Sequence, residues 1–502
     1  MLNLSAAIAY HANRTPDRPA IIYRDNTVSY AQFYNRIQHS AALLKARGIG
    51  RNDVVALFMK NSSAFLELVF AISHAGAIFL PINYRLAPAE VQFILEDAQV
   101  KLLLADDEFS ELAQLDVPTL VIDAAAQADS RQLPGAASDL FDPEPVDEDD
   151  LVRLMYTSGT TSRPKGVMHS YRNIYWKCMD HVIGLELNSR HRLLVVGPLY
   201  HVGAFDLPGI AVLWVGGALC VHREFDIQAV LSSIDRHQLN CGWMAPVMLS
   251  RVLAAPEATL FDLGTFEWCI AGGEKTPESR IRDFTRVFKK GRFIDAFGMT
   301  ETCSGDTLME PGRELEKIGS TGRATAHVEI RIADTDGQWL PANEKGEICI
   351  RGPKVSKGYW NAPEKTAEAF YGDWLRSGDV GYLDDDGFLY ITDRTKDMIL
   401  TGAENVASSE VEAVLYQLAQ IAEAAVVGVH DEKWGERIIA VVVLAPGGTL
   451  TLQDIDLHCR QHLASFKVPR ELKIVQELPR NPSGKVLKRV LRDQYNQDPA
   501  DA

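Results

Sequence analysis

The chain of 502 residues has no excess of basic residues, no long hydrophobic run and few cysteines. Its 51 basic residues against 67 acidic ones give a formal net charge of −16, which argues against a nucleic-acid partner because phosphate backbones are bound by basic surfaces. No hydrophobic run approaches the roughly 20 residues of a membrane-spanning helix, so we expect no membrane span. The seven cysteines form no CxxC pair and several lie in hydrophobic runs, which favours reduced thiols in the cytoplasm.

The remaining composition is that of a globular protein. Hydrophobic residues make up 46% and charged residues 24% of a chain that is too long for one simple domain. Residues 1–10 lack the basic leader and long apolar core of a signal peptide, and the last three residues are not Ser-Lys-Leu, so we expect neither a secretory nor a peroxisomal address.

Strand and helix signals alternate over about the first 390 residues. Residues 53–59 are typical of a buried strand, 64–75 have helical spacing, and 77–81 are typical of the next strand. This alternation predicts a largely parallel sheet with helices on its faces. Residues 328–332 and 347–351 alternate like strands of a smaller, partly antiparallel sheet. We therefore predict an α/β fold with layered sheets in a large N-terminal domain.

The C-terminal part has a pattern of its own. Helical and strand-like runs follow one another over residues 411–418 (helix), 424–429 and 437–444 (strands), 452–463 (helix) and 472–475 (strand). They predict a separate α+β domain of about a hundred residues. The expected division is an N-terminal domain over 1–393 and a C-terminal domain over 394–502.

A loop rich in hydroxyl groups and glycine follows the hydrophobic run 151–155. It reads Tyr156-Thr157-Ser158-Gly159-Thr160-Thr161-Ser162-Arg163-Pro164-Lys165-Gly166. Such a loop can wrap a polyphosphate, because glycine lets backbone N–H groups converge, hydroxyls donate hydrogen bonds and lysine adds a positive charge. It lacks the GxxxxGK[ST] spacing of the Walker loop. By itself, a loop of this composition is an ordinary exposed connection about as often as it is a phosphate-binding loop.

Four further motifs follow along the chain. They are Phe297-Gly298-Met299-Thr300-Glu301-Thr302, Trp374-Leu375-Arg376-Ser377-Gly378-Asp379, Asp393-Arg394-Thr395-Lys396-Asp397 and Asn481-Pro482-Ser483-Gly484-Lys485. Together with the first loop they resemble, over essentially the whole chain, the adenylate-forming superfamily of acyl-CoA synthetases, luciferases and peptide-synthetase adenylation domains. The resemblance is closest to stand-alone acid–CoA ligases. It implies ATP-dependent activation of a carboxylic acid as an acyl-adenylate, with release of pyrophosphate.

The resemblance assigns most motif residues to ATP and Mg²⁺. It implies that the β- and γ-phosphates are held by Thr157, Ser158, Gly159, Thr160, Thr161 and Lys165. It implies that phosphate and Mg²⁺ are bound at Thr300 and Glu301, and a carboxylate suits a hard cation. The nucleotide pocket would be formed by Phe297, Gly272, Gly273 and Glu274, and the ribose would be bound by Asp379 and Arg394. Taken alone, Phe297 would be a core aromatic and Thr300-Glu301 the start of a surface helix.

Two lysines of the later motifs have different roles by resemblance. Lys485 matches the adenylation lysine, whose flexible cation bridges the substrate carboxylate and the α-phosphate and offsets the repulsion between these anions. Lys396 matches the hinge about which the C-terminal domain rotates after adenylation. One departure from the family pattern is Ser162, which replaces the usual glycine before Pro-Lys-Gly.

The acid pocket is the least defined part of the resemblance. His201 matches the residue at the mouth of the acyl site. Candidate pocket residues, each of which could equally belong to the core, are Trp243, Met244, Val247, Met299 and Cys303. The sequence therefore leaves the identity of the small-molecule carboxylic acid open.

The acyl acceptor is expected to be CoA, with an amine as the alternative. Trp434 and Phe466 match positions that contact the CoA nucleotide in some relatives. Ala403 departs from the pattern, because CoA-binding relatives commonly have a second glycine there, where the pantetheine arm passes close to the backbone. An ATP-dependent amide synthetase, which passes the acyl group from the adenylate to an amine without CoA, therefore remains possible.

Overall fold

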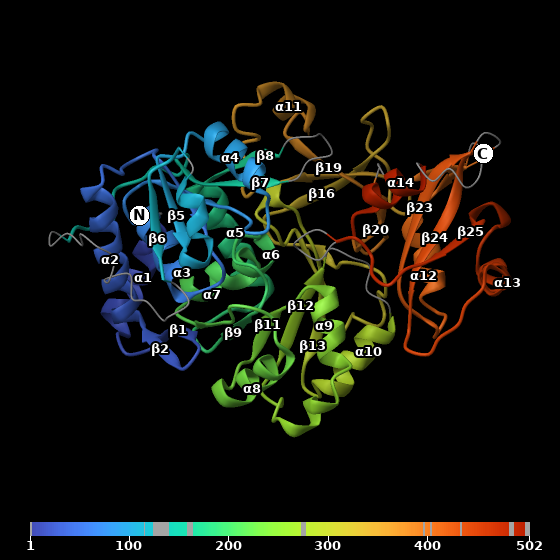
Figure 1. Cartoon of the computed structure of the whole chain (residues 1–502), viewed down its shortest axis with the longest axis horizontal. Coiled ribbons are helices and arrows are strands. Elements are labelled where there is room, and N and C mark those ends of the chain that lie inside the picture. Colours follow the sequence, from blue (N-terminus) through green and yellow to red (C-terminus); the bar gives the residue numbers. More distant parts are fainter. Residues whose placement is uncertain are drawn as a thin grey trace.

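The computed structural model describes residues 3–114, 116–123, 140–157, 164–272, 278–394, 397–401, 404–431, 434–480 and 486–496. Figure 1 shows a broad body built by most of the chain and, beside it, the C-terminal part with α12 (Ser408–Leu415) and α14 (Lys488–Asn496). Two large, mainly parallel sheets, a small antiparallel sheet and a fourth sheet in the C-terminal part organise these residues. The predicted α/β fold class is confirmed.

The first large sheet has the strand order β6-β5-β3-β4-β7-β8. Its strands are β3 (Val54–Phe58), β4 (Ile78–Pro81), β5 (Leu102–Asp106), β6 (Thr119–Ile122), β7 (Leu151–Thr157) and β8 (Lys165–Ser170). In the chain, α2 (Tyr30–Ala46) precedes β3, α3 (Ser63–His74) follows it, and α4 (Pro88–Asp97) follows β4. All pairs are parallel except the β7–β8 hairpin. Every residue of α3 is buried, which explains its nearly unbroken hydrophobic sequence.

The second large sheet has the order β15-β14-β13-β12-β11-β9-β10-β1-β2. Its strands are β1 (Pro19–Tyr23), β2 (Asn26–Ser29), β9 (Arg192–Val195), β10 (Ala218–Val221), β11 (Cys241–Trp243), β12 (Trp268–Gly272), β13 (Arg292–Phe297), β14 (Thr307–Leu308) and β15 (Arg323–Ala324). The helices of this region are α1 (Leu4–Arg14), α5 (Tyr171–Gly184), α7 (Ile210–Trp214), α8 (Ile227–His237), α9 (Pro246–Leu253) and α10 (Glu278–Val287). The strands from β13 to β1 are parallel, and antiparallel strands close both edges.

The small sheet is antiparallel, in contrast to the two large ones. It contains β16 (Glu329–Ala333), β17 (Gly346–Arg351), β18 (Phe370–Tyr371), β19 (Trp374–Leu383) and β20 (Leu389–Arg394), and α11 (Pro363–Glu368) precedes β18. Short helices connect elements at η1 (Asp107–Gln114), α6 (Val202–Ala204), η3 (Phe205–Gly209), η4 (Pro256–Leu260), η5 (Thr300–Thr302) and η6 (Ser465–Lys467). The strands predicted near 328–332 and 347–351 are thus confirmed.

The C-terminal part has a hydrophobic core of its own. Its sheet contains β21 (Ile399–Thr401), β22 (Glu404–Val406), β23 (Ile421–Asp431), β24 (Gly435–Leu444) and β25 (Glu471–Ile474), and α13 (Leu452–His462) joins α12 and α14 as its third helix. Successive residues of β23 face opposite sides, so that Val426 packs with Val411 and Ile455 while Val427 packs with Leu491. The helix predicted over 411–418 begins earlier, because the polar residues 408–410, which lack hydrophobic periodicity, form its first turn.

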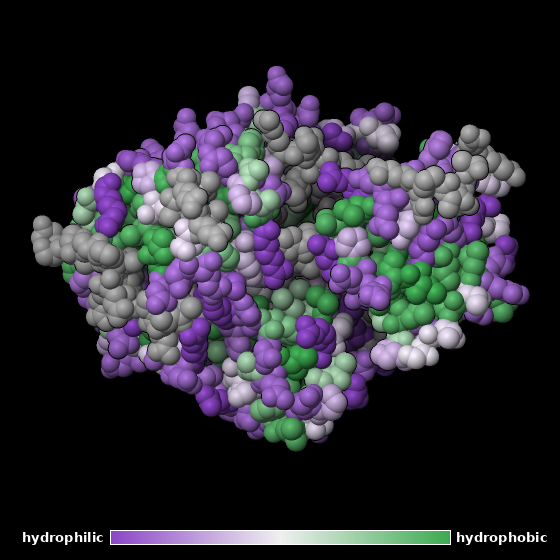
Figure 2. Space-filling model, in the orientation of Figure 1, coloured by the Kyte–Doolittle hydropathy of each residue, from purple (hydrophilic) through white to green (hydrophobic). Residues whose placement is uncertain are grey.

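The surface is mainly hydrophilic and the cysteines are buried, as expected from the composition. In Figure 2 hydrophilic residues cover most of the face shown, and hydrophobic residues gather over β24 and β25 of the C-terminal part. All seven cysteines lie among the described residues, and each is a buried free thiol, as their hydrophobic surroundings predicted. Within the described ranges, no helix combines the length and the apolar character needed to cross a membrane.

Histidines make the stability of the fold depend on pH. Burial lowers the pKa of His74, His169, His181 and His191, and it lowers the pKa of His222 to about 4. The unfolded chain therefore binds more protons than the folded chain below pH 6.5. Stability from these groups is fully present above pH 6.5 and is lost as the pH falls towards 4.

We expect the His222→Gln variant to lose less stability on acidification than the parent. The share of His222 between pH 6.5 and 4 is about 3 kcal/mol, since each pKa unit corresponds to about 1.4 kcal/mol. The free energy of unfolding, measured by urea titration at pH 7.5 and pH 4.5, would test this difference. Equal losses in the parent and the variant would contradict the assignment.

Candidate active site

The residues predicted to bind the acid and the adenine lie at one edge of the nine-stranded sheet. His201 follows β9, β11 ends at Trp243, β12 ends at Gly272 and β13 ends at Phe297. These four strands are neighbours and parallel, so their carboxyl ends meet at the same edge. Ligands of open α/β sheets bind outside this edge. The tertiary structure thus brings together residues that are up to about a hundred positions apart.

The segment after His201 lies against the end of β11. Nδ1 of His201 accepts a hydrogen bond from the N–H of Gly203 at 3.1 Å, which starts the short helix α6. A Cβ atom at Gly203 would lie 2.3 Å from the ring of Trp243, so only glycine allows this indole to pack against the backbone. Of the other candidates for the acid pocket, Met244 and Cys303 are completely buried in hydrophobic clusters, which confirms the core alternative for these two.

Tyr359 connects the lysine of the first motif to the glutamate of the second. Nζ of Lys165 lies 4.7 Å from the centre of the Tyr359 ring, and the Tyr359 hydroxyl donates to Oε1 of Glu301 at 2.9 Å. Burial, aided by the nearby carboxylate of Glu301, raises the pKa of Tyr359, so its hydroxyl stays protonated and can donate. Sequence reasoning missed Tyr359, since it is 58 residues from Glu301 and a single tyrosine carries no signal.

The hairpin β7–β8 places two of the predicted phosphate ligands opposite each other. Thr157 at the end of β7 pairs with Lys165 at the start of β8. Both residues flank the loop of the first motif, so both can face one polyphosphate group. Ten residues singled out in the sequence lie outside the described ranges: Ser158, Gly159, Thr160, Thr161, Ser162, Gly273, Glu274, Lys396, Ala403 and Lys485.

A buried lysine holds the turn that follows Glu301. Cys303, Ser304 and Gly305 have φ values of +56°, +69° and +68°, a left-handed run that costs about 1 kcal/mol or more for each non-glycine residue. The Lys354 ammonium donates to the carbonyls of Ser304 and Gly305 at 2.9 and 2.7 Å, and it lies 3.0 Å from the carboxylate of Asp306. Lys354 and Asp306 are both completely buried. These contacts stabilise the left-handed run.

The two residues predicted to bind ribose are neighbours in the small sheet. Asp379 on β19 is the cross-strand partner of Arg394 on β20. Gly378, with a φ of +72°, precedes Asp379, and the Ser377 hydroxyl accepts a hydrogen bond from the Asp379 N–H at 3.0 Å. This turn fixes the backbone at Asp379, which is mostly buried. The pairing places the two positions side by side in the small sheet.

The two residues predicted to contact CoA belong to the C-terminal part. The Arg470 guanidinium lies 4.2 Å from the centre of the Trp434 ring, an arrangement in which a flat cation covers an aromatic face. Phe466 in η6 is partly buried against the core of α12 and α13. Next to it, Lys467 forms an ion pair with Glu410 at 2.6 Å.

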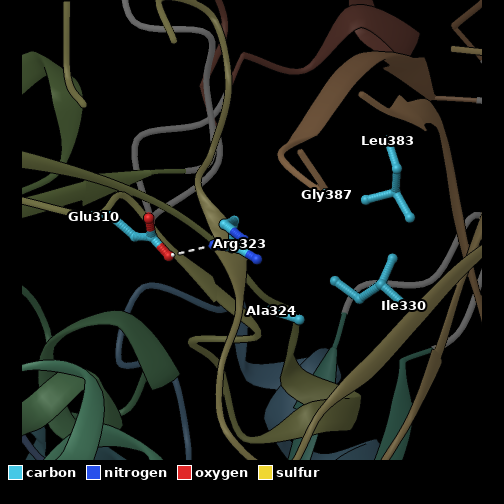
Figure 3. A pocket seen from close by; sticks show the side chains of 6 residues that line it. All are labelled: Glu310, Arg323, Ala324, Ile330, Leu383 and Gly387. Atoms are coloured by element: carbon cyan, nitrogen blue, oxygen red, sulfur yellow. Dashed lines mark hydrogen bonds and ion pairs between the residues drawn. The ribbon is translucent and has the colours of Figure 1, made fainter. Parts of the chain in front are cut away.

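A separate hollow of about 490 Å³ opens between β15 and the small sheet. Figure 3 shows the ion pair of Glu310 and Arg323 on one side and Ile330, Leu383 and Gly387 on the other. None of the residues that line it belongs to the predicted site. Two of them, Ile330 and Leu383, pack against the hydrophobic cluster that contains Phe297.

The fold defines a class of protein, namely a layered α/β protein whose parallel strands can bind a ligand outside their carboxyl ends. A family model described as AMP-binding enzyme matches residues 8–360, and the model of the AMP-binding enzyme C-terminal domain matches residues 410–485. The chain belongs to the AMP-binding enzyme family.

Relatives of known name match almost the whole chain. A feruloyl-CoA synthase from Amycolatopsis sp. is 35% identical over 489 residues, which cover 96% of this chain and 97% of the relative. Long-chain-fatty-acid–CoA ligase FadD13 of Mycobacterium tuberculosis is 36% identical over 507 residues and 99% of each chain. The solved o-succinylbenzoate CoA synthetase from Bacillus subtilis, in complex with its acyl-adenylate intermediate, has a TM-score of 0.87 at 32% identity and covers 97% of this chain and 98% of its own.

We expect the Lys354→Met variant to lose about 3–5 kcal/mol of stability, because it leaves the Asp306 carboxylate buried without its cation. Lys357→Met is the matched control, since Lys357 forms an exposed ion pair with Asp149 and should cost less than about 1 kcal/mol. Urea unfolding of both variants at pH 7.5 measures the difference. Equal losses would refute the role given to Lys354.

Proposed function

We propose that this chain is an ATP-dependent acid–CoA ligase. It activates a small-molecule carboxylic acid as an acyl-adenylate, releases pyrophosphate and then transfers the acyl group to CoA. The observation that carries this proposal is the similarity, over 96% of the chain or more, to relatives that are named as CoA ligases or synthases. The ordered motifs and their positions at the strand ends support it.

The described residues fit ATP and Mg²⁺. Thr157 and Lys165 flank the phosphate loop, and Glu301 offers a carboxylate that the Tyr359 hydroxyl orients. A hard cation prefers such oxygen ligands, and when bound it neutralises charge on the phosphates. The related Bacillus subtilis synthetase has also been solved with ATP and a magnesium ion, at a TM-score of 0.85. Phe297 is assigned to the adenine, and Asp379 with Arg394 to the ribose.

The first half-reaction joins two anions, which must be brought together against their repulsion. A carboxylate oxygen of the acid bonds to the α-phosphorus of ATP, and pyrophosphate leaves with the electrons of the broken P–O bond. Lys485 is assigned to bridge the two anions, and Lys165 and Thr157 to stabilise the charge that develops on pyrophosphate. His201 is assigned to the mouth of the acid site, close to the reacting carboxylate.

The second half-reaction needs a different set of residues. The thiol of CoA loses its proton, its sulfur bonds to the acyl carbon, and AMP leaves with the electrons of the C–O bond. We assign Trp434 and Phe466 to the CoA nucleotide. We also assign the domain boundary to residues 393–397 and the hinge to Lys396, because β20 ends at Arg394 and the C-terminal part beyond it has its own core. Rotation of the C-terminal domain about this hinge withdraws the residues of the first half-reaction and presents those of the second.

A competition experiment identifies the acid and the acceptor together. The protein is incubated with Mg-ATP, a panel of carboxylic acids, CoA and simple amines, and the products are read by mass spectrometry. We expect acyl-CoA. Amides without thioesters would replace this proposal with the amide-synthetase alternative, which the departure at Ala403 leaves open. Absence of any acid-dependent pyrophosphate release would contradict both.

We expect Lys485→Ala to lower the rate of adenylation by about a hundredfold or more, because the repulsion between two anions is no longer offset. Thioester formation from synthetic acyl-adenylate and CoA should change much less, since Lys485 acts in the first half-reaction. Lys289→Ala, at an exposed lysine before β13, is the control for loss of one positive charge. Full adenylation activity in Lys485→Ala would remove this residue from the mechanism.

A further inference from the structure

A line of completely buried polar side chains ends at the backbone of Thr300. Nη1 of Arg153 donates to Oδ2 of Asp206 at 2.7 Å, and Nε of Arg153 donates to Nδ1 of His169 at 3.0 Å. Nε2 of His169 lies 2.7 Å from the carbonyl oxygen of Thr300. All three side chains have 0% exposure. The line therefore reaches from the interior to the residue next to Glu301.

The hydrogen-bond partners determine which nitrogen of His169 carries the proton. An arginine side chain only donates, so Nδ1 of His169 must accept from Arg153. The proton then resides on Nε2, which donates to the carbonyl of Thr300. The direction of both hydrogen bonds is thereby fixed by the geometry.

Arg153 is itself held firmly in place. Its partner Asp206 also faces a second buried cation, since Nζ of Lys177 lies 3.6 Å from Oδ1 of Asp206 and 3.2 Å from its carbonyl oxygen. A buried charge separated from its partner is costly, so this arrangement resists displacement. Arg153 thus anchors His169, and His169 in turn holds the Thr300 carbonyl in one position.

The hairpin β7–β8 contains Arg153 and His169 of this line and also the two predicted phosphate ligands. Thr157 pairs with Lys165, and Arg153 pairs with His169. The two pairs are four residues apart along each strand, so they share one face of the hairpin. The strand β8 therefore holds Lys165 directly and the turn of Thr300 through a single hydrogen bond.

We propose that His169 is a positioning residue for the turn of Thr300 and Glu301. Through the Thr300 carbonyl it sets the distance between Glu301 and Lys165, and so between the metal ligand and the phosphate ligand. This inference rests on the proposed roles of Glu301 and Lys165 in binding Mg-ATP. His169 touches neither substrate, and its effect is expected in the metal dependence of adenylation.

The test compares two substitutions at His169. His169→Leu removes both hydrogen bonds, and we expect the Mg²⁺ concentration for half-maximal adenylation to rise about tenfold, as loss of a buried hydrogen bond would produce. His169→Gln, whose amide can accept from Arg153 and donate to Thr300, should restore the Mg²⁺ dependence to within about threefold. The KM of the acid should change by less than about twofold in both, because the acid is assigned to the site of His201 and not to Glu301 or Lys165.

A second buried histidine provides the matched control. His74 is also completely buried and is also bonded at both nitrogens, to the Ser5 hydroxyl at 3.0 Å and to the Phe141 carbonyl at 2.8 Å. His74→Leu should lose stability like His169→Leu but keep the parent Mg²⁺ dependence. If His74→Leu shifts the Mg²⁺ dependence equally, the effect of His169 is merely structural and the proposal is overturned.

The Glu301→Gln variant distinguishes the proposed role of His169 from the proposed metal role of Glu301. A raised Mg²⁺ requirement in Glu301→Gln with an unchanged one in His169→Leu overturns the role of His169 alone. An unchanged requirement in Glu301→Gln overturns the metal role of Glu301, and the inference falls with it. If His169→Leu does not fold, the ¹⁵N–¹H spectrum of the histidine-labelled parent decides, because a proton on Nδ1 of His169 at pH 7.5 contradicts the assigned hydrogen bonds.

Discussion

The buried ion pair of Arg153 and Asp206 links the two large sheets, which also share a hydrophobic core. Arg153 belongs to β7 of the six-stranded sheet, whereas Asp206, 53 residues later, follows β9 of the nine-stranded sheet in η3. Removing one member of such a pair leaves an uncompensated charge in a dry interior, which typically costs about 3–5 kcal/mol. The pair therefore helps to fix how the two sheets approach each other. The positions of the residues that we assign to ligands at the ends of these strands depend on that relation.

A second buried charge pair does similar work closer to the site. Lys354 and Asp306 hold a turn whose backbone includes the left-handed Cys303 and Ser304. The many exposed ion pairs of this protein contribute little to stability, because solvent screens them and side-chain entropy opposes them. Buried pairs differ because their geometry cannot relax into water. They are consequently suited to holding Glu301 in one place.

The same rigidity is not expected throughout the chain. The C-terminal part has its own hydrophobic core, with α12 and α13 on one face of β23 and β24 and α14 on the other. Such a unit can turn as a body without loss of its internal packing. A rigid body with the residues assigned to ATP, combined with a C-terminal unit with those assigned to CoA, would suit the proposed reaction in two steps.

The sequence showed which chemical groups each motif contains. It did not show which distant residues the fold brings together. Hydrophobic periodicity predicted the strands near 53–59 and 437–444 to within a few residues, because it reflects contacts within one element, and ordered motifs predicted the class of the site. Tyr359 and His169 escaped sequence reasoning, because their partners lie 58 and 131 residues away and no local pattern encodes those contacts. The sequence by itself thus determined the family and most of the elements. Only the tertiary structure decided which charges are buried and which backbone atoms they hold, since the cost of burying a charge is set by neighbours that folding brings together.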